Sequence, residues 1–214
     1  ADSVNLTWNA LKEAKQPRLQ VCAPVSSVQM EYLFHKKPAA MLDAIRSTLS
    51  ECCKVCADVE FVADDATRSD PAFLYEAVRT AISAGANTVT VCDTAGAMLP
   101  NEFTAFIREL YANVPELKEV VLGVSCSDNL SMADSCAIAA VRAGARELKA
   151  AAYRLDAVSL PNVAKVLSAK GDAFGVSSSV RTTQLKRITD QIAWMYETGK
   201  SKNSPFENGV QEDE

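Results

Sequence analysis

The feature that most constrains this fold is a regular alternation of short β-rich runs with longer helical patterns. The helical stretches lie at about 38–56, 71–84, 101–113, 131–143 and 159–170. Alternation with a repeat of about 30 residues predicts βα units and a parallel sheet. The β-rich runs are almost continuously apolar, which is typical of strands covered on both faces. They are Arg18–Cys22, Val59–Ala63, Thr88–Cys92, Val120–Val124 and Glu147–Ala152.

The helix boundaries support this frame. Ser69-Asp70-Pro71 offers a capping side chain followed by proline at the first helical position. Gly85 and Gly144 each follow an alanine-rich helix, where a left-handed residue commonly ends a helix. The segments around these glycines, Ala81–Ala86 and Ala140–Ala145, are alike in sequence. This weak internal repeat fits a barrel or a doubly wound sheet equally well.

The two ends of the chain differ from the middle. Residues 1–15 read as the tail of a helix, and residues 181–199 form an amphipathic helix with Leu185, Ile188 and Ile192 on its apolar face. The last 14 residues, 201–214, are polar and predict a linker or tail.

Composition excludes several classes of function. Hydrophobic residues make up 48% and charged residues 23%, the balance of a soluble globular protein. A net charge of -5 provides no basic field for nucleic acid or anionic lipid, and no apolar run is long enough to span a membrane. Seven cysteines, an odd number without framework spacing, favour a reduced cytoplasmic setting.

Ligands in parallel βα folds gather at the carboxyl ends of the strands. After the second run, Asp64, Asp65 and Arg68 offer a general base and an anion anchor. The alternative is a charged loop in which Asp70 caps the next helix. After the third run, the Thr94 hydroxyl could bind a carboxylate, or Asp93-Thr94 could simply form a turn.

Other polar clusters carry weaker signals. Ser125 and Ser127 follow the fourth run and point the same way, but no histidine lies near them in the sequence to activate a nucleophile. The cluster Cys52-Cys53-Lys54-Val55-Cys56 ends a helix, so buried thiols are a better interpretation than zinc or a redox pair. The single histidine, His35, lies in a predicted loop and is expected to be solvated.

Taken together, these segments resemble the family of 2-isopropylmalate synthase and homocitrate synthase. The most specific match is Asp64–Pro71, which reads Asp-Asp-Ala-Thr-Arg-Ser-Asp-Pro, and Asp93–Gly96 matches the family's Asp-Thr-x-Gly. Met30–Tyr32 and Ala139–Arg146 match as well. The resemblance covers nearly the whole chain from about residue 5.

The resemblance implies an α/β fold of parallel βα units. These form an incomplete TIM barrel, equivalent to the family's strands 4 to 8, with a C-terminal helix. The domain boundaries predicted in this way are a partial barrel at 1–178, a helix at 179–200 and a linker or tail at 201–214. The family reaction is a Claisen-type condensation of an acyl-CoA with a 2-oxo acid, in amino-acid and specifically leucine biosynthesis. In the family a divalent metal polarises the oxo acid and a base removes a proton from the acyl group.

The comparison with the family argues against metal chemistry in this chain. The family's ligands are an aspartate on strand 1, a His-x-His on strand 7 and an asparagine after strand 8. Strands 1 to 3 have no counterpart here, Ser125 and Ser127 replace the histidines, and Ala157 falls at the asparagine. A serine hydroxyl is a poor ligand for a divalent cation compared with imidazole. We therefore expect no metal site and no cofactor.

Only part of the family's pocket is retained. Asp64 stands in place of the family's strand-5 glutamate and is the one candidate catalytic base, while Thr94 and Arg68 are the candidate substrate-binding residues. Gln20 and Val62 replace a histidine and a serine of the family. The sequence therefore predicts a 2-isopropylmalate synthase-like pseudoenzyme, inactive as this chain alone, whose family implies acyl-CoA and 2-oxo acid partners.

Two alternatives remain open. The chain could be a non-catalytic binding or structural subunit that completes a barrel with another chain, or a gene remnant. A sheet with two open edges also predicts a homo-oligomer or a companion chain.

Overall fold

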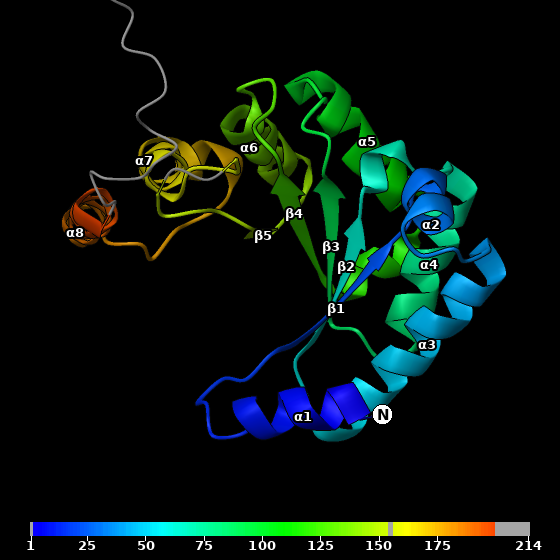
Figure 1. The fold of residues 1–214 in the computed structure, drawn as a ribbon. Coiled ribbons are helices and arrows are strands. Elements are labelled where there is room, and N and C mark those ends of the chain that lie inside the picture. Colours follow the sequence, from blue (N-terminus) through cyan, green and yellow to red (C-terminus); the bar gives the residue numbers. More distant parts are fainter. Residues whose placement is uncertain (1, 154–155, 200–214) are drawn as a thin grey trace, which may run out of the picture. The chain divides into compact units, whose positions relative to one another are not determined.

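The computed structural model describes residues 2–153 and 156–199. Five parallel strands form one sheet, and their spatial order β1-β2-β3-β4-β5 is also their order along the chain (Figure 1). Within the described residues β1 and β5 each pair with a single neighbour, so the sheet is open. The strands are β1 (Leu19–Pro24), β2 (Val59–Asp64), β3 (Thr88–Asp93), β4 (Val121–Cys126) and β5 (Glu147–Leu148).

Helices follow the strands in sequence. The α-helices are α1 (Asp2–Leu11), α2 (Ser27–Tyr32), α3 (Pro38–Val55), α4 (Pro71–Ser83), α5 (Pro100–Asn113), α6 (Ala133–Ala143), α7 (Leu160–Lys170) and α8 (Thr182–Gly199). Short 3₁₀ turns are η1 (Ala66–Arg68), η2 (Pro115–Glu119) and η3 (Gly171–Phe174). No helix of the described residues has the length and apolarity needed to cross a membrane.

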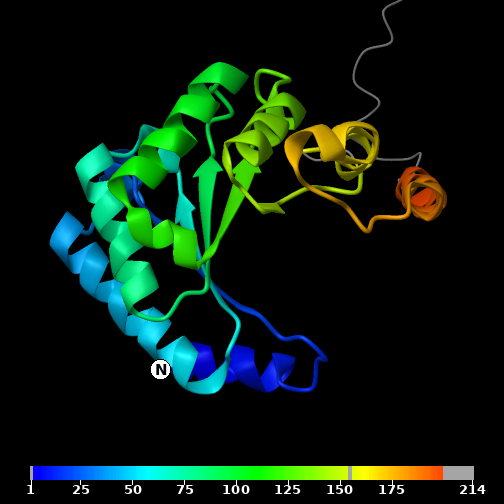
Figure 2. The ribbon, with the colours of Figure 1, turned by 180° about the vertical axis from the view of Figure 1, so that it is seen from behind.

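Helices α3 to α6 lie along one side of the sheet (Figures 1 and 2). The main apolar core lies between them and the strands, because alternate strand residues point toward the helices. Each large apolar side chain buried there contributes about 1.5–3 kcal/mol. The core includes Ile45, Leu49, Phe61, Leu74, Val89, Phe103, Ile107 and Leu122, none more than 1% exposed.

The opposite face of the sheet, called the inner face below, carries the other half of the alternation. Register pairs Gln20 with Glu60 and Cys92 with Ser125, so these side chains emerge on the same side of the sheet. Polar residues and thiols therefore line the inner face as far as the carboxyl ends of the strands.

The chain divides into two compact units. The first contains the described residues 2–151 and 156–158, with the whole sheet. The second contains 152–153 and 159–199, with α7, η3 and α8. Inside the second unit the rings of Tyr153 and Tyr196 meet edge to face, with centroids 5.3 Å apart.

The structure confirms the predicted parallel α/β architecture and the order of its strands. Asp70 caps α4 by accepting a hydrogen bond from the Phe73 amide at 3.0 Å, and Gly85 and Gly144 adopt positive φ, at 107° and 124°. The predicted strand Glu147–Ala152 is wrong in length, because only Glu147–Leu148 pair with β4. The sequence pattern did not indicate α2, a single short helix capped by Ser26. The predicted tail at 201–214 lies outside the described residues.

Candidate functional site

Two loops meet at the carboxyl ends of β2 and β3. Thr94, the residue after β3, donates its hydroxyl proton to Asp64 Oδ1 at 2.6 Å. The same Thr94 oxygen accepts a hydrogen bond from the backbone N–H of Asp65 at 2.9 Å. The structure thus brings together the candidate base and one candidate substrate-binding residue. Because Thr94 has a single hydroxyl proton, it cannot donate to a ligand without releasing Asp64.

Arg68 is held away from this pair by a different carboxylate. Its Nε and Nη2 donate to the two oxygens of Asp65 at 2.7 and 2.8 Å, a bidentate arrangement. The Asp65 side chain is fully buried and its φ of 59° lies in the left-handed region. The Arg68 side chain is 50% exposed, and the hydrogen bond to Asp65 raises its pKa. Of the two adjacent carboxylates, Asp65 therefore has a structural role and Asp64 alone faces Thr94.

Asp93 fastens the loop that carries Thr94. One carboxylate oxygen accepts from the Thr67 hydroxyl at 2.9 Å and the other from the Met98 backbone N–H at 3.1 Å. Asp93 is 2% exposed, so both bonds are shielded from water. The turn interpretation of Asp93-Thr94 is also right, because the Gly96 N–H donates to the Asp93 carbonyl at 3.1 Å; Thr94 lies within this turn, and its side chain reaches Asp64.

The resemblance assigns the family's metal-ligand positions to Ser125, Ser127 and Ala157. Ser125 lies on the inner face beside the Cys92 thiol, and Ser127 follows β4. Ala157 has only a methyl group, while its neighbour Asp156 accepts a hydrogen bond from the Asp128 backbone N–H at 2.6 Å. Two neutral hydroxyls and a methyl do not fit a divalent metal. Among the described residues, no group of three or more His, Cys, Asp or Glu side chains could hold a metal ion.

The thiols near the site are held in the neutral form. Burial raises the pKa of Cys92 to about 12, and the nearby charge of Asp64 adds to this effect. Burial also raises the pKa of Cys22, the one cysteine in the exposed class. Since the thiolate is the reactive form, neither group is an activated nucleophile at neutral pH. All seven cysteines are free, including the cluster at the end of α3.

Below this edge, charged side chains fill the inner face. Glu60 is 1% exposed and accepts hydrogen bonds from Thr90 at 2.6 Å, Lys149 at 2.9 Å and Gln20 at 3.2 Å. Lys149 also donates to Glu147 at 2.7 Å. No sequence motif marks this network, although Glu60, a charged residue within an otherwise apolar strand, is a signal for it.

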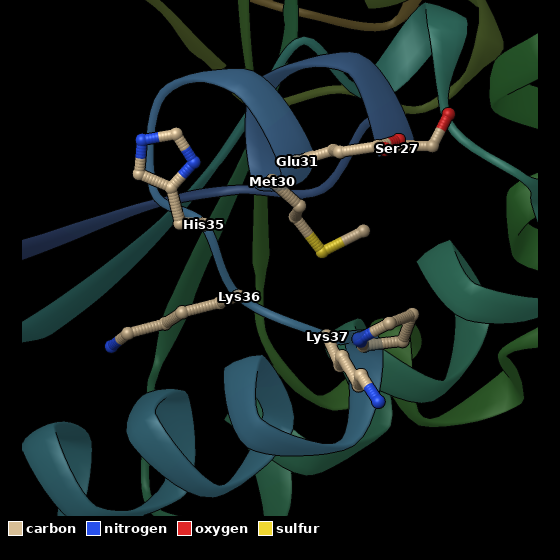
Figure 3. A pocket seen from close by; sticks show the side chains of 7 residues that line it. Ser27, Met30, Glu31, His35, Lys36 and Lys37 are labelled. Atoms are coloured by element: carbon tan, nitrogen blue, oxygen red, sulfur yellow. The ribbon is translucent and has the colours of Figure 1, made fainter.

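A separate cavity of about 430 Å³ lies between α2 and the start of α3 (Figure 3). The buried Met30 side chain points into it, and His35, Lys36 and Glu31 stand on its rim. The cavity does not include the Asp64–Thr94 pair among its lining residues. His35 is exposed, as its predicted loop position implied.

The fold and the carboxyl-edge site define an α/β protein built on part of a barrel, and comparison with known proteins identifies its family. Residues 3–192 match the family model described as HMGL-like. This chain belongs to the HMGL-like family.

Relatives in sequence carry the name predicted from the motifs. The chain is 34% identical to 2-isopropylmalate synthase of Aquifex aeolicus over 191 residues, 87% of this chain and 37% of that protein. It is 28% identical to the same-named protein of Clostridium kluyveri over 196 residues, 90% of this chain and 38% of that protein. The chain thus spans less than two fifths of the length of these curated relatives.

Solved structures agree on the fold. Hydroxymethylglutaryl-CoA lyase from Pseudomonas aeruginosa matches 88% of this chain and 65% of its own, with a TM-score of 0.70 and 16% identity. The carboxyl transferase domain of Rhizobium etli pyruvate carboxylase with pyruvate and biocytin matches 67% of this chain and 25% of its own, with a TM-score of 0.54 and 18% identity. At these identities the likeness concerns the fold alone.

Proposed function

We propose that this chain is a 2-isopropylmalate synthase-like protein that does not catalyse the condensation of an acyl-CoA with a 2-oxo acid on its own. The observation that carries the proposal is the donor set at the carboxyl edge, where Ser125, Ser127 and Ala157 occupy the positions implied for metal ligands. Without a metal, no group at this edge replaces the polarisation of the oxo acid carbonyl.

The remaining carboxylate supports the same proposal. Asp64 is one methylene shorter than the family's glutamate, and its carboxylate already accepts a hydrogen bond from the Thr94 hydroxyl. Misplacing a reacting group by about 1 Å can cost roughly a hundredfold in rate. Loss of metal polarisation removes several kcal/mol more, and each 1.36 kcal/mol is about tenfold in rate. The combined loss places turnover below detection.

The test is release of free CoA from acetyl-CoA with 2-oxoisovalerate, 2-oxoglutarate or pyruvate, with added manganese. We expect no turnover above a protein-free blank. Turnover by the unmodified chain that Asp64→Asn and Thr94→Val both abolish would contradict the proposal. The variant carrying Ser125→His, Ser127→His and Ala157→Asn serves as a comparison that restores three of the implied donors, without the strand-1 aspartate.

Metal binding can be tested without activity. Calorimetric titration with manganese, zinc or magnesium should give no site tighter than about millimolar, the regime of weakly held exposed carboxylates. A micromolar site that Asp64→Ala weakens at least tenfold would show that the carboxyl edge still binds a cation. The matched control is Asp43→Ala, which removes an exposed carboxylate on α3.

A second function rests on the open sheet. Because β1 and β5 each have one paired neighbour in the described sheet, the chain could act as a structural subunit that completes a barrel with another chain. Light scattering on the purified chain should then give a mass above that of one copy, or a mixed peak that a companion chain resolves. A sharp monomer peak with cooperative unfolding would contradict this second function. Participation in leucine biosynthesis and a cytoplasmic location belong to the proposal as well.

A further inference from the structure

On the inner face, an ion pair joins residues at the two edge strands, which are not neighbours in the sheet. Arg18, directly before β1, donates from Nη1 to the two carboxylate oxygens of Glu147 on β5, at 2.7 and 2.9 Å. These residues are 129 positions apart in the sequence and lie at the first and last strands of the sheet, Arg18 just before β1 and Glu147 in β5. Nothing in the backbone hydrogen bonding joins β1 to β5 in the described sheet.

A second ion pair, between Lys149 and Glu60, also spans the inner face. Lys149, just after β5, donates hydrogen bonds to Glu60 on β2 at 2.9 Å and to Glu147 at 2.7 Å. Arg18 also holds Asp58 through its Nε at 3.0 Å and lies 3.8 Å from Glu60. The five groups form one connected set, with two positive and three negative charges, that reaches across β3 and β4.

The surroundings make these charge pairs stronger than surface pairs. Glu60 is 1% exposed, and the side chains of Glu147, Lys149 and Arg18 are 24%, 32% and 33% exposed. Hydrogen bonds between charged groups strengthen where water is partly excluded. Burial alone would raise the pKa of Glu147, but the hydrogen bonds from Arg18 and Lys149 outweigh it and hold that pKa below its usual value.

We propose that the Arg18–Glu147 and Lys149–Glu60 ion pairs act as a clamp across the inner face, which holds β5 toward the β1–β2 end of the open sheet at the curvature of a barrel. A strongly twisted open sheet has no covalent or backbone constraint that fixes the approach of its edges. The clamp supplies this constraint from within the chain. This inference concerns the shape of the sheet and does not depend on the proposed lack of catalysis.

The test is hydrogen exchange of the full chain, read at single amides. The reporters are the amides of Leu19, Arg146 and Lys149, which bond to Asp58, Leu122 and Val124 on the neighbouring strands. The references are amides of β3 and α4. Arg18→Gln and Glu147→Gln should each accelerate the reporters about tenfold while the references change less than twofold. The double variant should stay close to the larger single effect, because both substitutions remove the same bridge.

Each alternative result is decisive. Equal acceleration of the reporter and reference amides would show general destabilisation and contradict the clamp. Additive effects of the two substitutions in the double variant would show that loss of the Arg18–Glu147 pair does not cause the acceleration. The matched control, Arg46→Gln, removes an exposed arginine pair with Asp43 on α3 and should leave all amides unchanged. If the glutamine variants fail to fold, Arg18→Lys keeps the charge but cannot hold Asp58 and Glu147 together. Reporters unchanged in that variant would contradict the proposal.

Discussion

Gly123 illustrates how one residue can depend on a side chain of the next strand. A Cβ at Gly123 would overlap the Thr90 hydroxyl oxygen and would lie 3.5 Å from the Glu147 Cβ. Thr90 in turn donates to Glu60 at 2.6 Å. The absence of a side chain at Gly123 therefore leaves room for the hydroxyl that helps to satisfy a buried carboxylate. Sequence alone did not indicate this requirement, because it depends on register between strands 30 residues apart.

We predict that Gly123→Ala lowers the free energy of unfolding by about 1–3 kcal/mol, the usual effect of overpacking. Urea unfolding followed by circular dichroism measures the change. Thr90→Ala removes the hydroxyl, the closest contact of the added methyl, and leaves the Thr90 Cβ 3.3 Å away, so Gly123→Ala should cost less in that background than in the unmodified chain. Equal costs in the two backgrounds would show that Thr90 is not the group displaced.

At the scale of elements, much of the fold was predictable because the signals are local. Apolar runs marked the strands, and Asp70-Pro71 marked the start of α4 to the residue. The elements that were missed or misjudged depend on tertiary contacts. β5 is short because, two residues after Lys149 bonds to Val124 of β4, the Ala151 N–H bonds to Val158 instead. Helix α2 is only six residues long and too short to show periodicity.

We predict that Asp70→Ala lowers the free energy of unfolding by about 1 kcal/mol, because the Phe73 amide loses its cap. Asp70→Asn keeps a capping oxygen and should cost only a few tenths of a kcal/mol. Glu76→Ala, on the exposed side of the same helix, should stay within about 0.5 kcal/mol. Thermal unfolding of the three variants compares them. An Asn variant as unstable as the Ala variant would argue against the cap.

Across the whole molecule, the candidate site was only partly predictable. The motif reading placed Asp64 and Thr94 at neighbouring strand ends, and the structure joins them by a hydrogen bond. It could not foresee that Arg68 would bind Asp65, or that charges from β1, β2 and β5 would meet on the inner face. The Arg68–Asp65 pair depends on the left-handed backbone at Asp65, and the other pairs join residues about 90 to 130 positions apart, so no short sequence pattern marks either.

We predict that acid weakens the fold partly through Glu147. Its pKa is lowered in the folded chain, so its contribution is present above the unfolded value of about 4.3 and disappears as pH falls through the folded value. The free energy of unfolding should therefore drop between about pH 5 and 3, and Glu147→Gln should reduce that drop. Urea unfolding across this range measures both. An exposed control, Glu76→Gln, should leave the drop intact, and a Glu147→Gln curve identical to the unmodified one would contradict the prediction.

The unequal lengths of the outer strands have a consequence for growth of assemblies. β1 presents six residues at its outer edge, whereas β5 presents two. Strand-by-strand addition needs a run of unpaired backbone groups, which the β1 edge offers and the β5 edge hardly does. A chain with one edge strand available for pairing forms a dimer and stops, whereas a chain with two such edges can polymerise. Pairing through the β1 edge would thus stop at two copies, because the two residues of β5 in the described sheet offer little backbone for a further addition.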